Sequence, residues 1–262
     1  MDFGLGGKLA MVAAASKGLG LAIAQELAKE GCNMSICARN QEALESAAES
    51  LRSLGVKVHA ASCDVTSEDS LHAWFESTVS DLGTPAILVT NTGGPPAGRA
   101  SEMTDAQWQF GVDCTLLNVV RLVRMVSPGM IEAKWGRIVH LTSYVAKDPS
   151  AILPISSTLR AGLTALTKLQ ALELAPHGIT VNGILPGNVL TDRQLHLAEV
   201  RAKAEGISPQ QALERAEASM PMGRLGRPDE IAAAAAFLCS ERASLVSGVS
   251  LLVDGALSHG LG

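Results

Sequence analysis

The sequence lacks an excess of positive charge. Its 262 residues include 21 Lys and Arg against 26 Asp and Glu, which gives a formal net charge of −5. Non-specific binding of nucleic acid needs a basic face, and attraction to an anionic membrane surface needs a polybasic patch. We therefore expect neither nucleic acid nor a membrane among the partners of this chain.

Long apolar runs are also missing. No stretch of about 20 consecutive apolar residues is present, so we expect no segment that spans a bilayer. At the N-terminus, Asp2 stands where a secretory signal carries positive charge, so we expect no such signal either.

The cysteine and histidine patterns exclude two further classes. Five widely spaced cysteines form no CxxC pair, which predicts reduced, mostly buried thiols in a cytoplasmic protein. None of the six histidines is spaced with cysteine or acidic residues as metal ligands are, so we expect no metal site.

The residues that are present favour a large packed core. Hydrophobic residues make up 47% of the chain and charged residues 18%, which excludes a disordered protein. Short apolar runs alternate with longer helical patterns. The expected strands are 9–13, 33–38, 56–62, 86–90, 136–142, 179–185 and 249–253, and the expected helices include 18–30, 41–54, 67–82, 105–134 and 155–175. This alternation predicts an α/β fold: a single domain over residues 1–262 with a doubly wound, Rossmann-type parallel sheet of seven strands and helices on both faces.

One segment interrupts the alternation. Residues 188–223 contain two polar helical patterns, about 192–205 and 209–218, directly after the sixth expected strand. Open α/β sheets bind ligands beyond the carboxyl ends of their strands. We therefore expect a helical lid here, and the alternative is a solvated surface excursion.

A glycine-containing turn lies between the first expected strand and the first expected helix. It reads Ala14-Ala15-Ser16-Lys17-Gly18-Leu19-Gly20. Gly18 lets the backbone approach a pyrophosphate, Gly20 allows close packing of helix and strand, and the helix N-terminus offers N–H donors. The pattern favours a dinucleotide site, and the alternative is a turn without a ligand.

The end of the second expected strand has no carboxylate. An Asp or Glu there would accept the 2′-hydroxyl of the adenosine ribose, but the chain has Arg39. A guanidinium can donate two parallel hydrogen bonds to a 2′-phosphate, and Lys17 supplies a second cation. The two cations favour NADP(H) over NAD(H), unless Arg39 is an ordinary surface residue.

With these motifs the chain resembles the short-chain dehydrogenase/reductase superfamily, and within it the 3-oxoacyl-(acyl-carrier-protein) reductases. The resemblance covers nearly the whole chain. It includes the turn at 14–20, the stretch 136–143 and the tail 223–255. It implies cofactor contacts from Ser16, Lys17, Gly18, Leu19, Gly20, Arg39, Asp64, Val65, Asn91, Gly93, Arg160, Pro186, Gly187, Val189 and Thr191. It also implies a small-molecule carbonyl or alcohol substrate and a homotetramer or homodimer.

The chain departs from this family at the positions that carry the chemistry. Of the family's Asn, Ser, Tyr and Lys, only the serine is kept, as Ser143; Ser156 stands at the tyrosine position, Arg160 at the lysine position and Thr115 at the asparagine position. A phenol titrates near pKa 10, whereas the hydroxyl of Ser156 titrates far higher and does not readily exchange a proton at pH 7. Arg160 can hold a ribose hydroxyl, but a guanidinium does not relay protons.

Replacement proton donors are available nearby. Tyr144, the only tyrosine, follows Ser143, and Lys147 comes three residues later. Neighbouring residues of an extended segment point to opposite sides, so we expect Tyr144 to face away from Ser143 and Lys147 to be solvated. His140 is expected to be a satisfied core histidine.

Three hypotheses about function follow. The first is an NADP(H)-dependent oxidoreductase that acts on a carbonyl/alcohol pair through Ser143, Ser156 and Arg160. The second is a cofactor-binding, redox-silent scaffold or sensor, and the third is an isomerase or lyase that uses the same pocket. The candidate contacts for an anionic substrate are Arg99, Arg193, His196 and Arg201, each of which is otherwise a surface residue.

Overall fold

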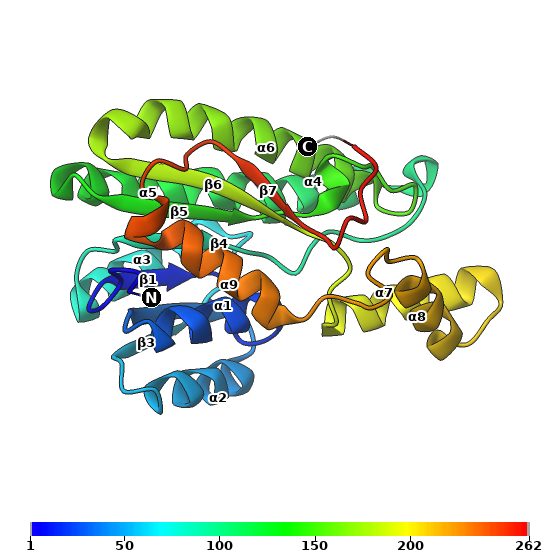
Figure 1. The fold of residues 1–262 in the computed structure, drawn as a ribbon, viewed down its shortest axis with the longest axis horizontal. Coiled ribbons are helices and arrows are strands. Elements are labelled where there is room, and N and C mark those ends of the chain that lie inside the picture. Colours follow the sequence, from blue (N-terminus) through cyan, green and yellow to red (C-terminus); the bar gives the residue numbers. More distant parts are fainter. Residues whose placement is uncertain (1, 261–262) are drawn as a thin grey trace.

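Seven parallel strands form one sheet in the computed structural model, which describes residues 2–260 (Figure 1). The strand order is β3-β2-β1-β4-β5-β6-β7, and every neighbouring pair is parallel. The strands are β1 (Leu9–Val12), β2 (Asn33–Ala38), β3 (Val58–Ser62), β4 (Ile87–Thr90), β5 (Gly136–Leu141), β6 (Ile179–Pro186) and β7 (Ser250–Val253). The expected seven-stranded doubly wound sheet is confirmed, and its strand order reverses between β1 and β4, where such sheets bind ligands.

Helices cover both faces of the sheet. They are α1 (Gly18–Lys29), α2 (Gln41–Arg52), α3 (Glu68–Leu82), α4 (Asp105–Val112), α5 (Asn118–Ala133), α6 (Pro154–Leu174), α7 (Asp192–Glu205), α8 (Pro209–Ala218) and α9 (Pro228–Cys239). One buried cluster joins α1, α2 and α9 to the sheet, and a second joins α3, α5 and α6 to the opposite face. Burial on both faces explains why the strands have continuous apolar runs rather than alternating ones.

The long helix expected at 105–134 is divided in the structure. A turn of π-helix, η2 (Asp113–Leu117), separates α4 from α5. By length and composition alone, the helical run Asp105–Ala133 could cross a membrane. No such segment is expected from the sequence, because no stretch of about 20 consecutive apolar residues is present. The apolar side chains of α5, among them Val119, Leu122 and Val126, are buried against the sheet, and this packing accounts for their hydropathy.

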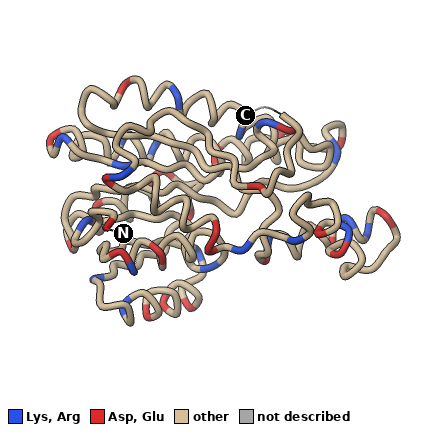
Figure 2. The backbone as a smooth tube through the Cα atoms, viewed as in Figure 1, with Lys and Arg blue, Asp and Glu red and all other residues tan. Residues whose placement is uncertain are grey.

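Residues 188–223 hold α7 and α8, which pack against each other and extend away from the sheet (Figure 1). Ala198, Ala202 and Ala212 form their small shared core. A capping box between Ser208 and Gln211 starts α8. Figure 2 shows charged residues of both signs on this pair, as its polar sequence predicts. That α7 and α8 act as a lid stays a prediction.

Candidate functional site

A cavity of about 640 Å³ lies at the carboxyl ends of the strands, between the sheet and α7. It extends from the glycine-containing turn and the end of β2 to the N-terminal part of α6. The residues selected from the sequence that line it are Ser16, Lys17, Gly18, Leu19, Arg39, Asp64, Val65, Asn91, Gly93, Ser143, Ser156, Arg160, Pro186, Gly187, Val189 and Thr191. The structure therefore brings together residues that are spread over most of the chain. Of the predicted cofactor-binding and catalytic residues, only Gly20 does not line the cavity.

The N-terminus of α1 opens into this cavity. Its first N–H groups have no side-chain cap, and its first turn contains no acidic residue. Gly18 has a φ of +59°, in the left-handed region that favours glycine. A Cβ on Gly20 would lie 2.5 Å from the carbonyl oxygen of Ala14, so only glycine fits where helix and turn meet. Uncapped N–H groups and a positive helix end fit the pyrophosphate of a dinucleotide.

Ala14 has an unusual backbone for its side chain. Its φ is +49°, a conformation that L-residues other than glycine seldom adopt. The carbonyl of Ala14 accepts a hydrogen bond from Nδ2 of Asn91 at 3.1 Å. The turn is thus fixed to the end of β4, although the residue with the positive φ is an alanine and not a glycine.

The two candidate cations for a 2′-phosphate differ in their partners. Lys17 Nζ forms an ion pair with Asp192 Oδ2 at 2.7 Å, and both side chains are largely exposed. Arg39 is exposed at the end of β2, lines the cavity and forms no ion pair within residues 2–260. Of the two cations, Arg39 is therefore the one available to an incoming anion.

Asp64 is fixed at the end of β3. Its Oδ1 accepts hydrogen bonds from the backbone N–H of Thr66 at 3.0 Å and from the Thr66 hydroxyl at 2.8 Å. These bonds, together with the charge of Arg39, hold the pKa of the Asp64 carboxyl below its ordinary value. Asp64 is thus ionised at neutral pH.

The candidate catalytic residues meet where α6 begins. Ser156 and Arg160 are one helical turn apart, and Arg160 Nε donates a hydrogen bond to Ser156 Oγ at 3.1 Å. Arg160 Nη1 also donates to the carbonyl oxygen of Leu141, at the end of β5, at 3.0 Å. Burial lowers the pKa of Arg160 to about 10, so the guanidinium is still charged at neutral pH. The arrangement supplies hydroxyl groups and a fixed positive charge, without a phenol at this position.

The π-turn contains Thr115, the residue that the resemblance places at the family's asparagine position. Thr115 is buried within this turn and does not line the cavity, whereas its neighbour Cys114 does. The hydroxyl of Thr115 lies 3.4 Å from Cys114 Sγ. Turns of π-helix are frequent at functional sites, and this one directs Cys114 toward the cavity in place of an amide.

Tyr144 differs from the expectation that it faces away from Ser143. The chain turns into a short 3₁₀-helix, η3 (Tyr144–Ala146), directly after Ser143, so the alternation of an extended segment does not apply. Both Ser143 and Tyr144 line the cavity, while Lys147 does not. Burial raises the pKa of the Tyr144 phenol above its ordinary value, which keeps it protonated at neutral pH.

His140 is a core residue, as expected. It is fully buried and its ring nitrogens lie 2.9 Å from Thr90 Oγ1 and 2.9 Å from Gln170 Oε1. Burial lowers the pKa of His140 to about 4. The five cysteines are free and buried, in agreement with the sequence, and no three metal-ligating side chains gather anywhere in residues 2–260.

The four candidate contacts for an anionic substrate divide into two pairs. Arg193 and Arg201 line the cavity, whereas Arg99 and His196 are exposed and do not. Cys114, Asp192 and Gln194 also line the cavity, although no sequence motif pointed to them. Their positions depend on the π-turn and on how α7 packs, and no local motif marks either feature.

Comparison with known proteins finds similarity along almost the entire chain. The family described as Enoyl-(Acyl carrier protein) reductase matches residues 13–258. The 3-oxoacyl-(acyl-carrier-protein) reductase of Pseudomonas aeruginosa is 35% identical over 253 residues, which cover 97% of this chain and 98% of the relative.

Two solved structures are similar to the whole fold. The L-sorbose reductase of Gluconobacter frateurii, complexed with NADPH and L-sorbose, superposes with a TM-score of 0.94 at 35% identity and covers 100% of both chains. A variant of actinorhodin polyketide ketoreductase with NADPH gives a TM-score of 0.94 at 34% identity, covering 97% of this chain and 98% of the other.

Proposed function

Because the chain belongs to the short-chain dehydrogenase/reductase family, we propose that it is an NADP(H)-dependent oxidoreductase acting on a carbonyl/alcohol pair with an altered proton-transfer apparatus. The observation that carries the proposal is the continuity of the cavity. One space of about 640 Å³ joins the uncapped N-terminus of α1 to Ser143, Ser156 and Arg160. The NADPH complexes of two structural relatives support the choice of cofactor.

In this proposal the cofactor residues have the following roles. The N-terminus of α1 binds the pyrophosphate, and Arg39 binds the 2′-phosphate. Arg160 holds a ribose hydroxyl near the nicotinamide, since Leu141 and Ser156 fix its guanidinium. A bound nicotinamide supplies or accepts the hydride.

In this proposal, hydroxyl groups of the protein form hydrogen bonds to the substrate oxygen. Ser143 Oγ donates a hydrogen bond to the carbonyl oxygen, and Ser156 adds a second donor or admits a water. Neither hydroxyl is an acid near pH 7, so the proton comes from water or from Tyr144, which lines the same cavity. Loss of a positioned general acid typically lowers the rate by about 10²–10⁴. We therefore expect slow turnover.

A titration and a turnover assay test the proposal together. Quenching of protein fluorescence measures the dissociation constants of NADPH and NADH, and absorbance of NADPH follows reduction of a panel of ketones and aldehydes. We expect saturable NADPH binding and slow, substrate-dependent NADPH oxidation. A protein that takes up neither nucleotide at millimolar concentration would refute the proposal.

Two other outcomes identify the alternative functions. NADPH binding without turnover on any carbonyl favours a redox-silent scaffold or sensor. Conversion of a substrate without a change in NADPH absorbance favours an isomerase or lyase.

The proposal extends to assembly and location. Large apolar side chains are exposed on α6, where Leu169 and Leu172 each have a relative exposure of 63%, and this supports a homodimer or homotetramer. The free, buried cysteines support a reducing, cytoplasmic location. Light scattering coupled to size-exclusion chromatography measures the assembly directly.

A further inference from the structure

The side chains that line the cavity have a net positive charge. Five of the side chains that line it are cationic and two are acidic: Lys17, Arg39, Arg160, Arg193 and Arg201 against Asp64 and Asp192. The difference, five minus two, is +3 in a chain whose formal net charge is −5. Asp192 is paired with Lys17, and Asp64 interacts with Arg39. Arg160, Arg193 and Arg201 have no ion-pair partner in the part of the chain that the structure describes.

Arg193 is held in place by the loop that follows β4. Its Nη2 donates a hydrogen bond to the carbonyl oxygen of Pro95 at 2.9 Å. Gly94, with a φ of +78°, lies against the guanidinium; a Cβ there would be 3.7 Å from Nη2 and 3.8 Å from Cζ. A Cβ at these distances would make ordinary contact, so it is the positive φ of this loop position that favours glycine. The hydrogen bond to Pro95 holds the guanidinium in the cavity with its other N–H groups unpartnered among residues 2–260.

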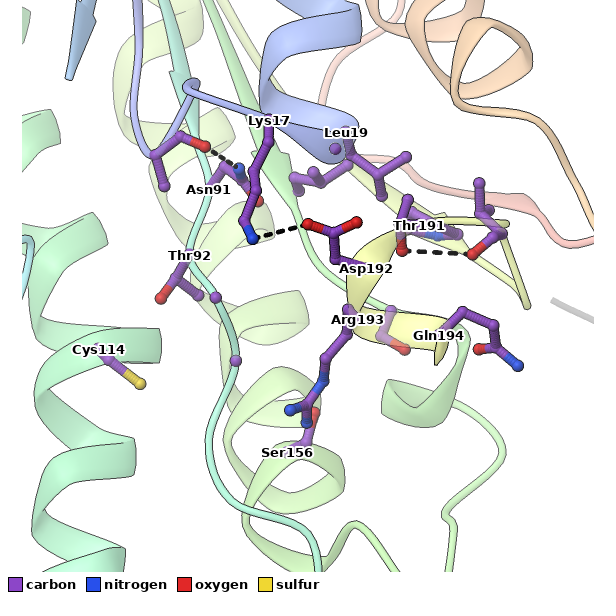
Figure 3. A pocket seen from close by; sticks show the side chains of 18 of the residues that line it. Lys17, Leu19, Asn91, Thr92, Cys114, Ser156, Thr191, Asp192, Arg193 and Gln194 are labelled. Carbon is purple, nitrogen blue, oxygen red and sulfur yellow. Dashed lines mark hydrogen bonds and ion pairs between the residues drawn. The ribbon is translucent and has the colours of Figure 1, made fainter. Parts of the chain in front are cut away.

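Arg193 points to the substrate end of the cavity. In Figure 3 it extends from the first turn of α7 away from Lys17 and toward Ser156. Its charge contributes to the lowered pKa of Arg160, and the two guanidinium groups share Cys114 as a neighbour. Arg160 is buried and Arg193 is partly buried. Two like charges held close together in this way, without a carboxylate to pair with them, are costly, and such arrangements are concentrated at functional sites.

The phosphates of NADP(H) do not account for this charge. In the proposed function those phosphates bind to the N-terminus of α1 and to Arg39. Arg39 interacts with Asp64 at the end of β3, and Arg193 extends away from Lys17 in the turn before α1 (Figure 3). Arg201 is eight residues beyond Arg193 on α7 and lines the same cavity, so both arginines lie on one side of the helix. The excess charge is therefore directed at the substrate.

Building on the proposed reductase function, we propose that the substrate is a carbonyl compound carrying an anionic oxygen group, a carboxylate or a phosphate. Arg193 binds this group through its planar fork of N–H donors, which matches both chemistries. Arg201 adds a second positive charge to the same side of the cavity. The anionic group thereby fixes the orientation of the carbonyl near Ser143 and Ser156.

The test compares matched pairs of compounds on the full-length protein. The pairs are 3-oxobutanoate and its methyl ester, 4-oxopentanoate and its methyl ester, and dihydroxyacetone phosphate and dihydroxyacetone. For each pair, NADPH absorbance gives kcat/KM, and calorimetry on the NADP⁺-loaded protein gives binding independently of turnover. We expect at least one anion to exceed its neutral partner by about 10-fold or more. The carboxylate and phosphate pairs distinguish the two sources of the anionic group.

Two variants and one control assign the preference to a residue. Arg193→Gln lowers kcat/KM or affinity for the anion by about 10- to 100-fold and leaves the neutral partner within about 3-fold. Arg201→Gln acts in the same direction, which keeps the proposal testable if Arg193→Gln does not fold. Lys203→Gln removes the same charge from the exposed side of α7, outside the cavity, and leaves both compounds unaffected.

The outcomes separate this inference from the proposed function. Suppose that the wild-type protein binds NADPH but converts or binds each neutral compound no less well than its anion, or binds neither member of any pair. Either result overturns the proposal of an anionic substrate and leaves the proposed function standing. A protein that does not bind NADPH overturns the proposed function and this inference with it. An anion preference that survives both arginine variants also overturns the assignment.

Discussion

Lys17 Nζ and Asp192 Oδ2 lie 2.7 Å apart and join the glycine-containing turn to the first turn of α7, 175 residues further along the chain (Figure 3). The pair is exposed, so its contribution to stability is small, at most about 1 kcal/mol. Its importance is electrostatic, because the carboxylate places a negative charge beside the site proposed for the cofactor phosphates.

Replacing Asp192 by Asn is expected to strengthen NADPH binding by about 3- to 10-fold at low salt, since it frees Lys17 and removes a repulsive charge. Titrations at low salt and at about 0.5 M salt check this, because screening should reduce the gain. Weaker binding by Asp192→Asn would instead mean that the ion pair holds α7 closed over the cofactor.

Arg39 is expected to determine the preference for NADPH over NADH. Arg39→Asp removes the cation available to the 2′-phosphate and supplies an acceptor for a 2′-hydroxyl, so the ratio of the two dissociation constants should shift toward NADH by about 100-fold. Fluorescence titrations with both nucleotides measure the ratio. Arg99→Asp makes the same charge change on an exposed residue outside the cavity and should leave the ratio unchanged. An unchanged ratio in Arg39→Asp would discard the 2′-phosphate contact.

The double variant Ser156→Tyr, Arg160→Lys is expected to restore a general acid whose pKa a nearby lysine lowers. Turnover of simple ketones should rise by about 10-fold or more, within the 10²–10⁴ that a positioned acid contributes. NADPH absorbance measures the rate. Ser156→Phe, Arg160→Lys is the matched control, since it adds the same ring without the hydroxyl. Equal rates in the two double variants would show that the substrate side of the pocket has diverged as well.

Much of the fold could be predicted from local sequence because its elements are long or strongly patterned. The second strand was expected at 33–38 and β2 is Asn33–Ala38. The helix expected at 105–134 was wrong in one respect, since the π-turn at Asp113–Leu117 interrupts it. An apolar periodicity near 3.6 residues does not reveal a single π-helical turn, because the residues that flank the turn are compatible with both an α-helix and a π-helix.

Site residues could be predicted where a local motif determines the backbone conformation. They could not be predicted where tertiary packing determines the position of a side chain. Most of the turn at 14–20, together with Arg39, lines the cavity because these residues directly follow buried strands. The pairing of Lys17 with Asp192 depends on where the first turn of α7 lies relative to the glycine-containing turn, which no local pattern encodes. Tyr144 was expected to face away, but the 3₁₀-turn after Ser143 removes the alternation on which that expectation rested.

Ala14 offers a test of backbone strain. Its φ of +49° costs an alanine about 1–2 kcal/mol relative to glycine, while glycine increases the entropy of the unfolded chain. Ala14→Gly is therefore expected to raise the free energy of unfolding by about 0.5–1 kcal/mol, measured by urea denaturation. Ala15→Gly, at a neighbouring buried position without a positive φ, is the control and should lower it. A loss of stability in Ala14→Gly would show that the alanine methyl group packs well enough to offset the strain.

His140 predicts how stability depends on pH. Its pKa is about 4 in the folded protein because of burial, and about 6.5 in the unfolded chain. Between these values the unfolded state binds more protons, so the free energy of unfolding is unaffected by this group above about pH 6.5 and falls as the pH is lowered toward 4, by about 3 kcal/mol in total. Urea denaturation between pH 4 and 7 measures this loss. His140→Gln keeps a hydrogen-bonding side chain beside Thr90 and Gln170 but does not titrate, so its stability should fall less over the same range. Equal pH dependence in both proteins would mean that other groups govern acid unfolding.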